Sequence, residues 1–189
     1  GRTLAQMRSL PQIVYLCEKQ DIPNGITTDD IVLHTHEECV ASKKAQAENF
    51  RHIEEESNKM HAQRLLQGVD GRYVVVNPPY PPMTTEEIDK SFDLPYQRVP
   101  HPKYKGKRIP AYEMIKFSVN LHRGCFGGCA FCTISAHQGK FIASRSKESI
   151  MKEIKEIVKL PDFKGYLSDL GGPSANMYNM RGRNIKACE

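Results

Sequence analysis

The stretch R-G-C-F-G-G-C-A-F-C-T-I-S, residues 123–135, decides how the rest of the chain is interpreted. It places Cys125, Cys129 and Cys132 at the spacing C-x3-C-x2-C. On a loop, this spacing lets all three sulfur atoms face one centre. Glycines between the cysteines allow the backbone to wrap closely around that centre. Thiolates are soft ligands, which select zinc, Cu(I) or an iron–sulfur cluster.

The number of thiols indicates the kind of site. Structural zinc sites have four protein ligands, and ordinary iron–sulfur electron carriers use four cysteines. Three protein ligands leave one position open for a substrate or a cofactor, so the stretch predicts a catalytic centre. Two alternatives stay open: a zinc site with His122 as a fourth ligand, and a non-catalytic iron–sulfur or zinc module that transfers electrons or holds structure.

Three segments carry a resemblance to a known family. They read H-R-G-C-F-G-G-C-A-F-C (122–132), H-Q-G-K-F-I-A-S-R-S (137–146) and D-L-G-G-P-S-A-N-M-Y (169–178). With an aromatic residue before the third cysteine, they resemble the YgiQ family of radical S-adenosylmethionine proteins, most strongly over residues 110–189. The resemblance implies a [4Fe–4S] cluster on the three cysteines, which reductively cleaves S-adenosylmethionine to a 5′-deoxyadenosyl radical. Radical chemistry of this kind belongs to the cofactor, and the protein supplies position and electrostatics.

The resemblance also assigns roles to single residues. It places Phe131 near the adenine of S-adenosylmethionine, although packing in the core is the alternative for this ring. It matches Gly171 and Gly172 to a glycine pair that offers backbone atoms to the methionine amino group. The family usually has Glu next, whereas this chain has Pro173. Cys188 resembles the first of several further cysteines in the family, and no catalytic side chain is assigned.

Composition limits the partners that we expect. The chain has 189 residues, 26% of them charged, and a formal net charge of +5, which is ordinary for a soluble globular protein. Clustered cysteines without a secretion signal favour a reducing, cytoplasmic location. No apolar run approaches the ~18–20 residues of a membrane span, so we expect no membrane partner.

The remaining partners follow from charge and from the resemblance. The basic residues between 103 and 108 are interpreted as an exposed loop, so we expect no nucleic-acid partner. The partners expected are a small-molecule cofactor, an unknown substrate and an external electron donor.

The pattern of apolar residues predicts an α/β fold. Residues 1–110 form an accessory region, the tail of an α/β domain, with strands at 12–17, 31–33 and 72–77. A long helix is expected from 35 or 36 to about 67, where Gly68 would end it. A short helix begins after Thr84 or Thr85, and a proline-rich linker at 94–110 leads to a domain boundary near Pro110.

Residues 111–189 predict the start of a partial (β/α) barrel of the radical-SAM type. A strand at 115–122 delivers the cysteine loop, a helix at 147–160 follows the N-cap Ser146, and a second strand lies at 166–170 before Gly171. Parallel strands bind ligands at their carboxyl ends, where both the loop and the glycines lie. A barrel needs more units than this, so we expect the chain to be an inactive fragment of a larger enzyme.

Overall fold

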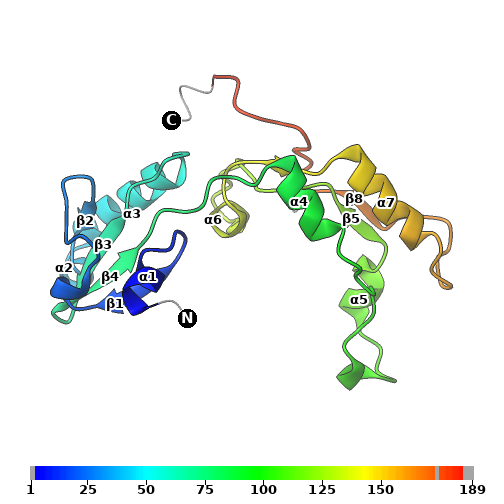
Figure 1. Cartoon of the computed structure of the whole chain (residues 1–189), viewed down its shortest axis with the longest axis horizontal. Helices are drawn as coiled ribbons and strands as arrows, with labels where there is room; N and C mark the ends of the chain where they lie inside the picture. Colours follow the sequence, from blue (N-terminus) through cyan, green and yellow to red (C-terminus); the bar gives the residue numbers. More distant parts are fainter. Residues whose placement is uncertain (1–2, 173–174, 185–189) are drawn as a thin grey trace. The chain divides into compact units, whose positions relative to one another are not determined.

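The computed structural model describes residues 3–172 and 175–184. Over these residues the chain is mixed α/β with small sheets, which confirms the predicted class (Figure 1). It forms two compact units, one that joins the chain up to Pro81 with the residues from Gly182 on, and one that covers Pro82–Arg181. Pro173 and Cys188 lie outside the described residues. Within the described part, no helix is both long and apolar enough to cross a membrane.

The first unit is built on a four-stranded sheet in the order β1-β4-β3-β2. Its strands confirm the predicted segments at 12–17, 31–33 and 72–77. The β2–β3 pair is parallel and the other two pairs are antiparallel. The strands are β1 (Val14–Cys17), β2 (Ile31–Leu33), β3 (Leu65–Val69) and β4 (Arg72–Val76), and the helices of this unit are α1 (Leu4–Arg8), the 3-10 turn η1 (Lys19–Asp21), α2 (His36–Ala41) and α3 (Lys43–Ser57).

The single long helix predicted for residues 35–67 is wrong. The chain forms two helices there, and then Leu65–Val69 enters the sheet. Ser42 adopts an extended backbone and its hydroxyl accepts the N–H of Ala45, so a new helix begins at this point. Leu66 is fully buried in the sheet. Burial beside β4 therefore outweighs the helix propensity of the segment, and Gly68 lies inside β3 rather than at a helix end.

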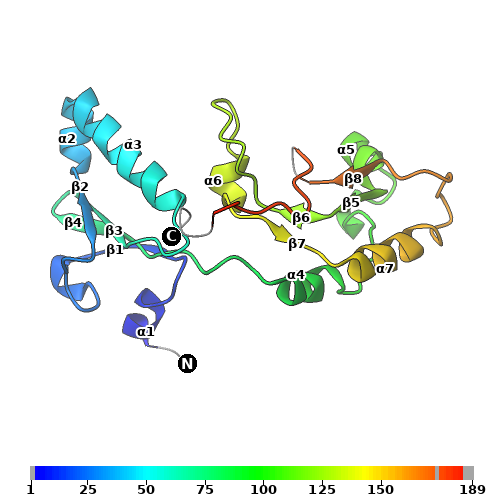
Figure 2. The same ribbon diagram turned by 90° about the horizontal axis from the view of Figure 1, so that it is seen from above.

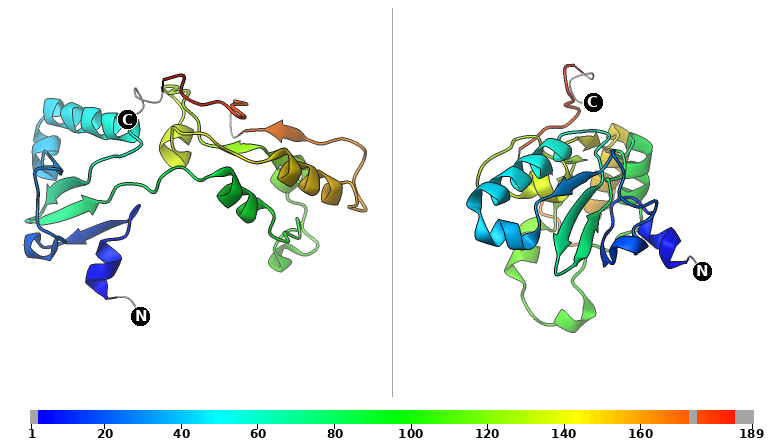
Figure 3. Two further views of the ribbon diagram at one scale, coloured as in Figure 1. Left: turned by 45° about the horizontal axis from the view of Figure 1, so that its top comes forward. Right: turned by 90° about the vertical axis from the view of Figure 1, so that its left-hand side faces the viewer.

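Helix α3 covers the sheet at β2 (Figure 3, left, cyan). Ala45 and Asn49 of this helix are buried. The Asn49 side chain accepts the N–H of His34 at 2.8 Å and donates to its carbonyl oxygen at 2.9 Å. The other face of the sheet holds a core that includes Cys17, Leu66 and Val75. Cys17 therefore serves as a small buried hydrophobe, and burial raises the pKa of its thiol.

An ion pair fixes the long loop between β1 and β2. Arg64 donates to both carboxylate oxygens of Asp30, at 2.8 and 2.6 Å, and also to the carbonyl oxygens of Pro23 and Gly25. The hydrogen bond from Arg64 holds the pKa of Asp30 below its ordinary value. One guanidinium thus ties the loop to the start of β3.

The second unit contains one β–α–β arrangement with a parallel strand pair (Figure 2). Its strands are β5 (Ser118–Asn120), β6 (His122–Arg123), β7 (Ala143–Ser144) and β8 (Asp169–Gly171). Its helices are α4 (Thr85–Phe92), the 3-10 turn η2 (Pro102–Tyr104), α5 (Pro110–Ile115), α6 (Ile134–Gln138) and α7 (Lys147–Ile157). Thr84 and Ser146 cap α4 and α7, as the sequence predicts.

Helix α7 packs on one face of β5. Phe117, Val119 and Leu121 alternate along this segment and are buried against Ile150 and Ile157 of the helix. Alternate residues of a strand share one face, so these three side chains form a continuous apolar surface. The helix predicted at 147–160 is present as α7, which ends at Ile157, and β5 leads directly into the cysteine loop.

The free edge of β5 is closed by two arginines. Arg98 donates to the carbonyl oxygens of Lys116 and Ser118, at 3.0 and 3.3 Å, and Arg145 donates to that of Asn120 at 2.9 Å. Both guanidinium groups also pair with Glu153 of α7. Unpaired strand edges can recruit other chains, and these arginines occupy the carbonyls that would do so.

The two compact units divide at Pro82, because α4 and the linker are bonded to the rest of the second unit. The domain boundary near Pro110 stays a prediction. Asp89 accepts the N–H of Ser146 at 3.0 Å, and Asp93 accepts the hydroxyl of Ser149 at 2.7 Å. The hydrogen bond from Ser149 holds the pKa of Asp93 below its ordinary value.

Candidate metal and cofactor site

The cysteine loop begins and ends at two paired strands of the second unit. Strands β6 and β7 pair antiparallel, with His122 opposite Ser144 and Arg123 opposite Ala143. The N–H of Leu121, just before β6, donates to the carbonyl oxygen of Gly171 at 2.8 Å. Residues 124–142 therefore form a loop with paired ends. The base of this loop lies beside the carboxyl end of β8.

Gly124 lets the two sides of the loop meet at its neck. Its φ is +90°, and a Cβ atom there would lie 1.9 Å from the carbonyl oxygen of Phe141. The next residue, Cys125, donates its N–H to the carbonyl oxygen of Gly139 at 3.0 Å. Only glycine permits this approach, because any side chain would collide with the opposite backbone.

Two of the three predicted ligands face the same point. The sulfur atoms of Cys125 and Cys129 lie 3.4 and 3.7 Å from the position that a Cβ on Gly127 would take. Cys125 is buried, whereas Cys129 is exposed. A glycine at 127 thus leaves open the space between two thiols.

The third cysteine lies on the next turn of the loop. Cys132 is half-buried and donates its N–H to the carbonyl oxygen of Cys129 at 3.0 Å. Within residues 3–172 and 175–184, no three His, Cys, Asp or Glu side chains are already gathered closely enough to hold a metal ion. The donor set still fits an iron–sulfur cluster, because three thiols lie on one short loop and two of them converge.

Phe131 lies on the surface of the loop. Its side chain is 92% exposed, so it is not a core residue in this structure. Phe126, on the same loop, is 48% exposed, and the sequence analysis did not single it out. Exposed aromatic rings beside the cysteines are available to a flat ligand such as a purine.

The glycine pair begins at Gly171, the last residue of β8, and lies close to a buried histidine. The Nε2 atom of His122 accepts the N–H of Met177 at 2.9 Å, and His122 itself is fully buried. A Cβ on Gly172 would lie 2.0 Å from that Nε2. In the zinc alternative His122 would have to bind the metal through Nδ1, because Nε2 already accepts the N–H of Met177.

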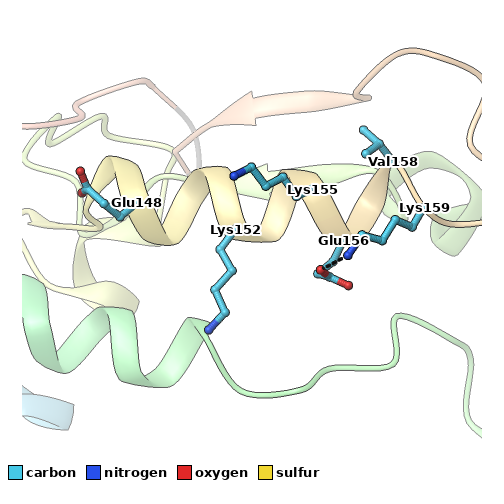
Figure 4. Close-up of a pocket in the computed structure, with 6 residues that line it drawn as sticks. All are labelled: Glu148, Lys152, Lys155, Glu156, Val158 and Lys159. Atoms are coloured by element: carbon cyan, nitrogen blue, oxygen red, sulfur yellow. Dashed lines mark hydrogen bonds and ion pairs between the residues drawn. The ribbon is translucent and has the colours of Figure 1, made fainter.

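Two surface depressions lie outside the cysteine loop. One, on the solvent face of α7, is lined by charged side chains such as Lys152, Lys155 and Glu148 and contains none of the predicted site residues (Figure 4). The other, of about 510 Å³, lies between α4 and β5 and includes Asn120 and Arg123. Neither depression is formed by the cysteines.

Comparison with known proteins identifies the family. The family described as "Radical SAM N-terminal" matches residues 1–118. The chain belongs to the YgiQ-like radical-SAM family. The UPF0313 protein of Bacteroides thetaiotaomicron is 69% identical over 96% of the chain, and that of Porphyromonas gingivalis is 60% identical over all of it. The YgiQ protein of Escherichia coli is 50% identical over 83% of the chain.

These YgiQ-like relatives are much longer than this chain. The chain spans 29% and 30% of the two UPF0313 proteins and 21% of the Escherichia coli protein. No solved structure matches the chain. The matched regions of both UPF0313 proteins are long enough to include the cysteine loop, which lies beyond the segment matched by the family description.

Proposed function

We propose that this chain carries the metal centre of a radical S-adenosylmethionine enzyme. The observation that supports this most directly is the closed cysteine loop, in which the sulfur atoms of Cys125 and Cys129 converge on Gly127. The base of this loop lies at the carboxyl ends of the parallel strands β5 and β8. Ligands in α/β folds bind at such ends.

Each residue then has a defined task. Cys125, Cys129 and Cys132 hold a [4Fe–4S] cluster as thiolates, and the backbone of Gly171 and Gly172 receives the methionine end of S-adenosylmethionine. The exposed ring of Phe131 lies against the adenine. When bound, the cluster and S-adenosylmethionine supply reductive cleavage to a 5′-deoxyadenosyl radical, with an electron from an external donor, for use on an unknown substrate.

The β5–α7–β8 arrangement is, in this proposal, the first βα unit and second strand of a partial (β/α) barrel. The rest of the barrel would come from the longer protein, so the piece alone would be inactive. The accessory region preceding β5 supplies Arg98, which caps the open edge of the first barrel strand. A reducing cytoplasm suits the exposed thiol of Cys129.

The test uses the full-length protein, reconstituted anaerobically with iron and sulfide. The measurements are iron and sulfide per chain, and 5′-deoxyadenosine formed from S-adenosylmethionine with dithionite. We expect about four irons, and product that disappears in Cys125→Ala, Cys129→Ala and Cys132→Ala. The matched control is Cys17→Ala, because that thiol is buried in the first unit.

Three results would overturn this proposal. A cluster that survives in all three variants would place the ligands elsewhere. A cluster that depends on the cysteines, in a protein that forms no 5′-deoxyadenosine, would favour the non-catalytic iron–sulfur module. Stoichiometric zinc in the protein as isolated from anaerobic cells would favour the zinc module.

A further inference from the structure

The two positions of the pair, Gly171 at the end of β8 and Gly172 directly after it, are glycine for different reasons. A Cβ on Gly171 would meet only a carboxylate oxygen of Asp169, at an ordinary 3.7 Å. A Cβ on Gly172 would lie 2.0 Å from Nε2 of His122 and 2.8 Å from the carbonyl oxygen of Ala175. Neither glycine has the positive φ that excludes other residues. Space therefore requires glycine at 172, and nothing in this structure requires it at 171.

His122 links two parts of the site that are distant in sequence. It begins β6, at the base of the cysteine loop, opposite Ser144. Its Nε2 accepts the N–H of Met177, in the segment after the glycine pair, at 2.9 Å. The ring thus lies between the neck of the loop and the backbone that follows β8, with Gly172 against its edge.

The hydrogen bonding of the ring is asymmetric. Because Nε2 accepts a hydrogen bond, the neutral ring carries its proton on Nδ1. Within the described residues, Nδ1 is buried and has no hydrogen-bond partner. A buried donor without a partner is unfavourable, so a histidine in this position calls for an explanation.

We propose that His122 is a positioning residue that sets the spacing between the cysteine loop and the Gly171–Gly172 backbone. Glycine at position 172 leaves room for the histidine ring. The hydrogen bond from the N–H of Met177 to Nε2 holds the segment after β8 in place. The inference that this spacing affects the binding of S-adenosylmethionine rests on the proposed function. The contact itself is a property of the protein without cofactor.

The first test is a double-mutant cycle on the thermal unfolding of the full-length protein without cluster. Gly172→Ala should lower the unfolding midpoint by about 5 °C or more, whereas the matched control Gly171→Ala should lower it by less than about 2 °C. In a His122→Ala background, the loss due to Gly172→Ala should fall to half or less. The loss that remains in this background is due to the contact of the new Cβ with the carbonyl oxygen of Ala175. Equal losses in both backgrounds would overturn the proposal.

The second test separates the two ring nitrogens in the reconstituted protein. Gln at position 122 can place an oxygen where Nε2 lies and accept the N–H of Met177. Asn is shorter and reproduces only the Nδ1 side of the ring. Titration of the cluster EPR signal should give His122→Gln an affinity for S-adenosylmethionine within about threefold of the wild type, and His122→Asn one weaker by about tenfold or more. Any other order of the two variants would overturn the positioning role.

The two tests also separate this inference from the proposed function. A wild-type protein that never binds S-adenosylmethionine would refute the proposed function, yet the unfolding cycle would still measure the contact of His122 with Gly172. A protein that binds the cofactor but shows no coupling between these residues would refute only the positioning role.

Discussion

Replacing Glu153 by alanine should destabilise the second unit severely. This carboxylate, on α7, is the shared partner of Arg98 and Arg145. The side chain of Arg145 is 0% exposed, and burial lowers the pKa of its guanidinium. Removing one partner of a buried ion pair costs about 3–5 kcal/mol, because a charge is left without compensation. For a unit of this size, such a loss lowers the unfolding midpoint by about 10 °C or more.

Helix α7 offers a matched control for this variant. Glu156 is also on α7, is 65% exposed, and pairs with Lys159 at 2.6 Å (Figure 4). An exposed pair of this kind is worth less than about 1 kcal/mol, so Glu156→Ala should shift the midpoint by only a few degrees. The assay is thermal unfolding followed by circular dichroism at neutral pH. If Glu153→Ala and Glu156→Ala unfold at the same temperature, the arginine-capped edge is not what stabilises β5.

Three further predictions address the ion pair, the cluster environment and the loop neck. Because Arg64 holds the pKa of Asp30 low, the pair contributes stability above the ordinary Asp value of about 3.9 and loses it as pH falls through the lower folded pKa. Asp30→Asn should therefore lower the urea midpoint at pH 7 and flatten its dependence on pH below about 4; an unchanged slope would contradict this. Arg123→Ala should lower the cluster midpoint potential in a redox titration, since a nearby cation stabilises the reduced, more negative cluster; an unchanged potential would remove the idea. Gly124→Ala should reduce bound iron by more than half, because its Cβ would meet a backbone carbonyl at 1.9 Å, whereas Gly128→Ala, also at positive φ but with open space, should retain most of it; equal iron contents would contradict the role of the neck.

Local signals in the sequence predicted much of the fold. The apolar runs of β1, β2 and β4, and the N-caps Thr84 and Ser146, depend on neighbouring residues and were found correctly. The error at Leu65–Val69 arose because burial in a sheet, a tertiary effect, decided a segment with helical neighbours. The Asp70–Gly71 dipeptide, both residues at positive φ between β3 and β4, is a typical hairpin signal that could have identified β3.

In the candidate site, too, local signals predicted some features, and contacts between distant residues decided the others. The three cysteines and the glycine pair were found from spacing and resemblance, and their role as ligands stays a prediction. The contact of His122 with Gly172 joins residues fifty positions apart, so no local pattern could show it. The arginine cap on β5 was missed for the same reason, since Arg98 comes from a linker that looks irregular in sequence.

The most direct test of the central claim is the EPR spectrum of the dithionite-reduced full-length protein, with and without S-adenosylmethionine. If Cys125, Cys129 and Cys132 hold a cluster with one open iron, the reduced protein should give a [4Fe–4S]⁺ signal whose g-values shift when S-adenosylmethionine is added. A cluster signal that is the same with and without S-adenosylmethionine would contradict the claim, because an iron site open to the cofactor must respond to it.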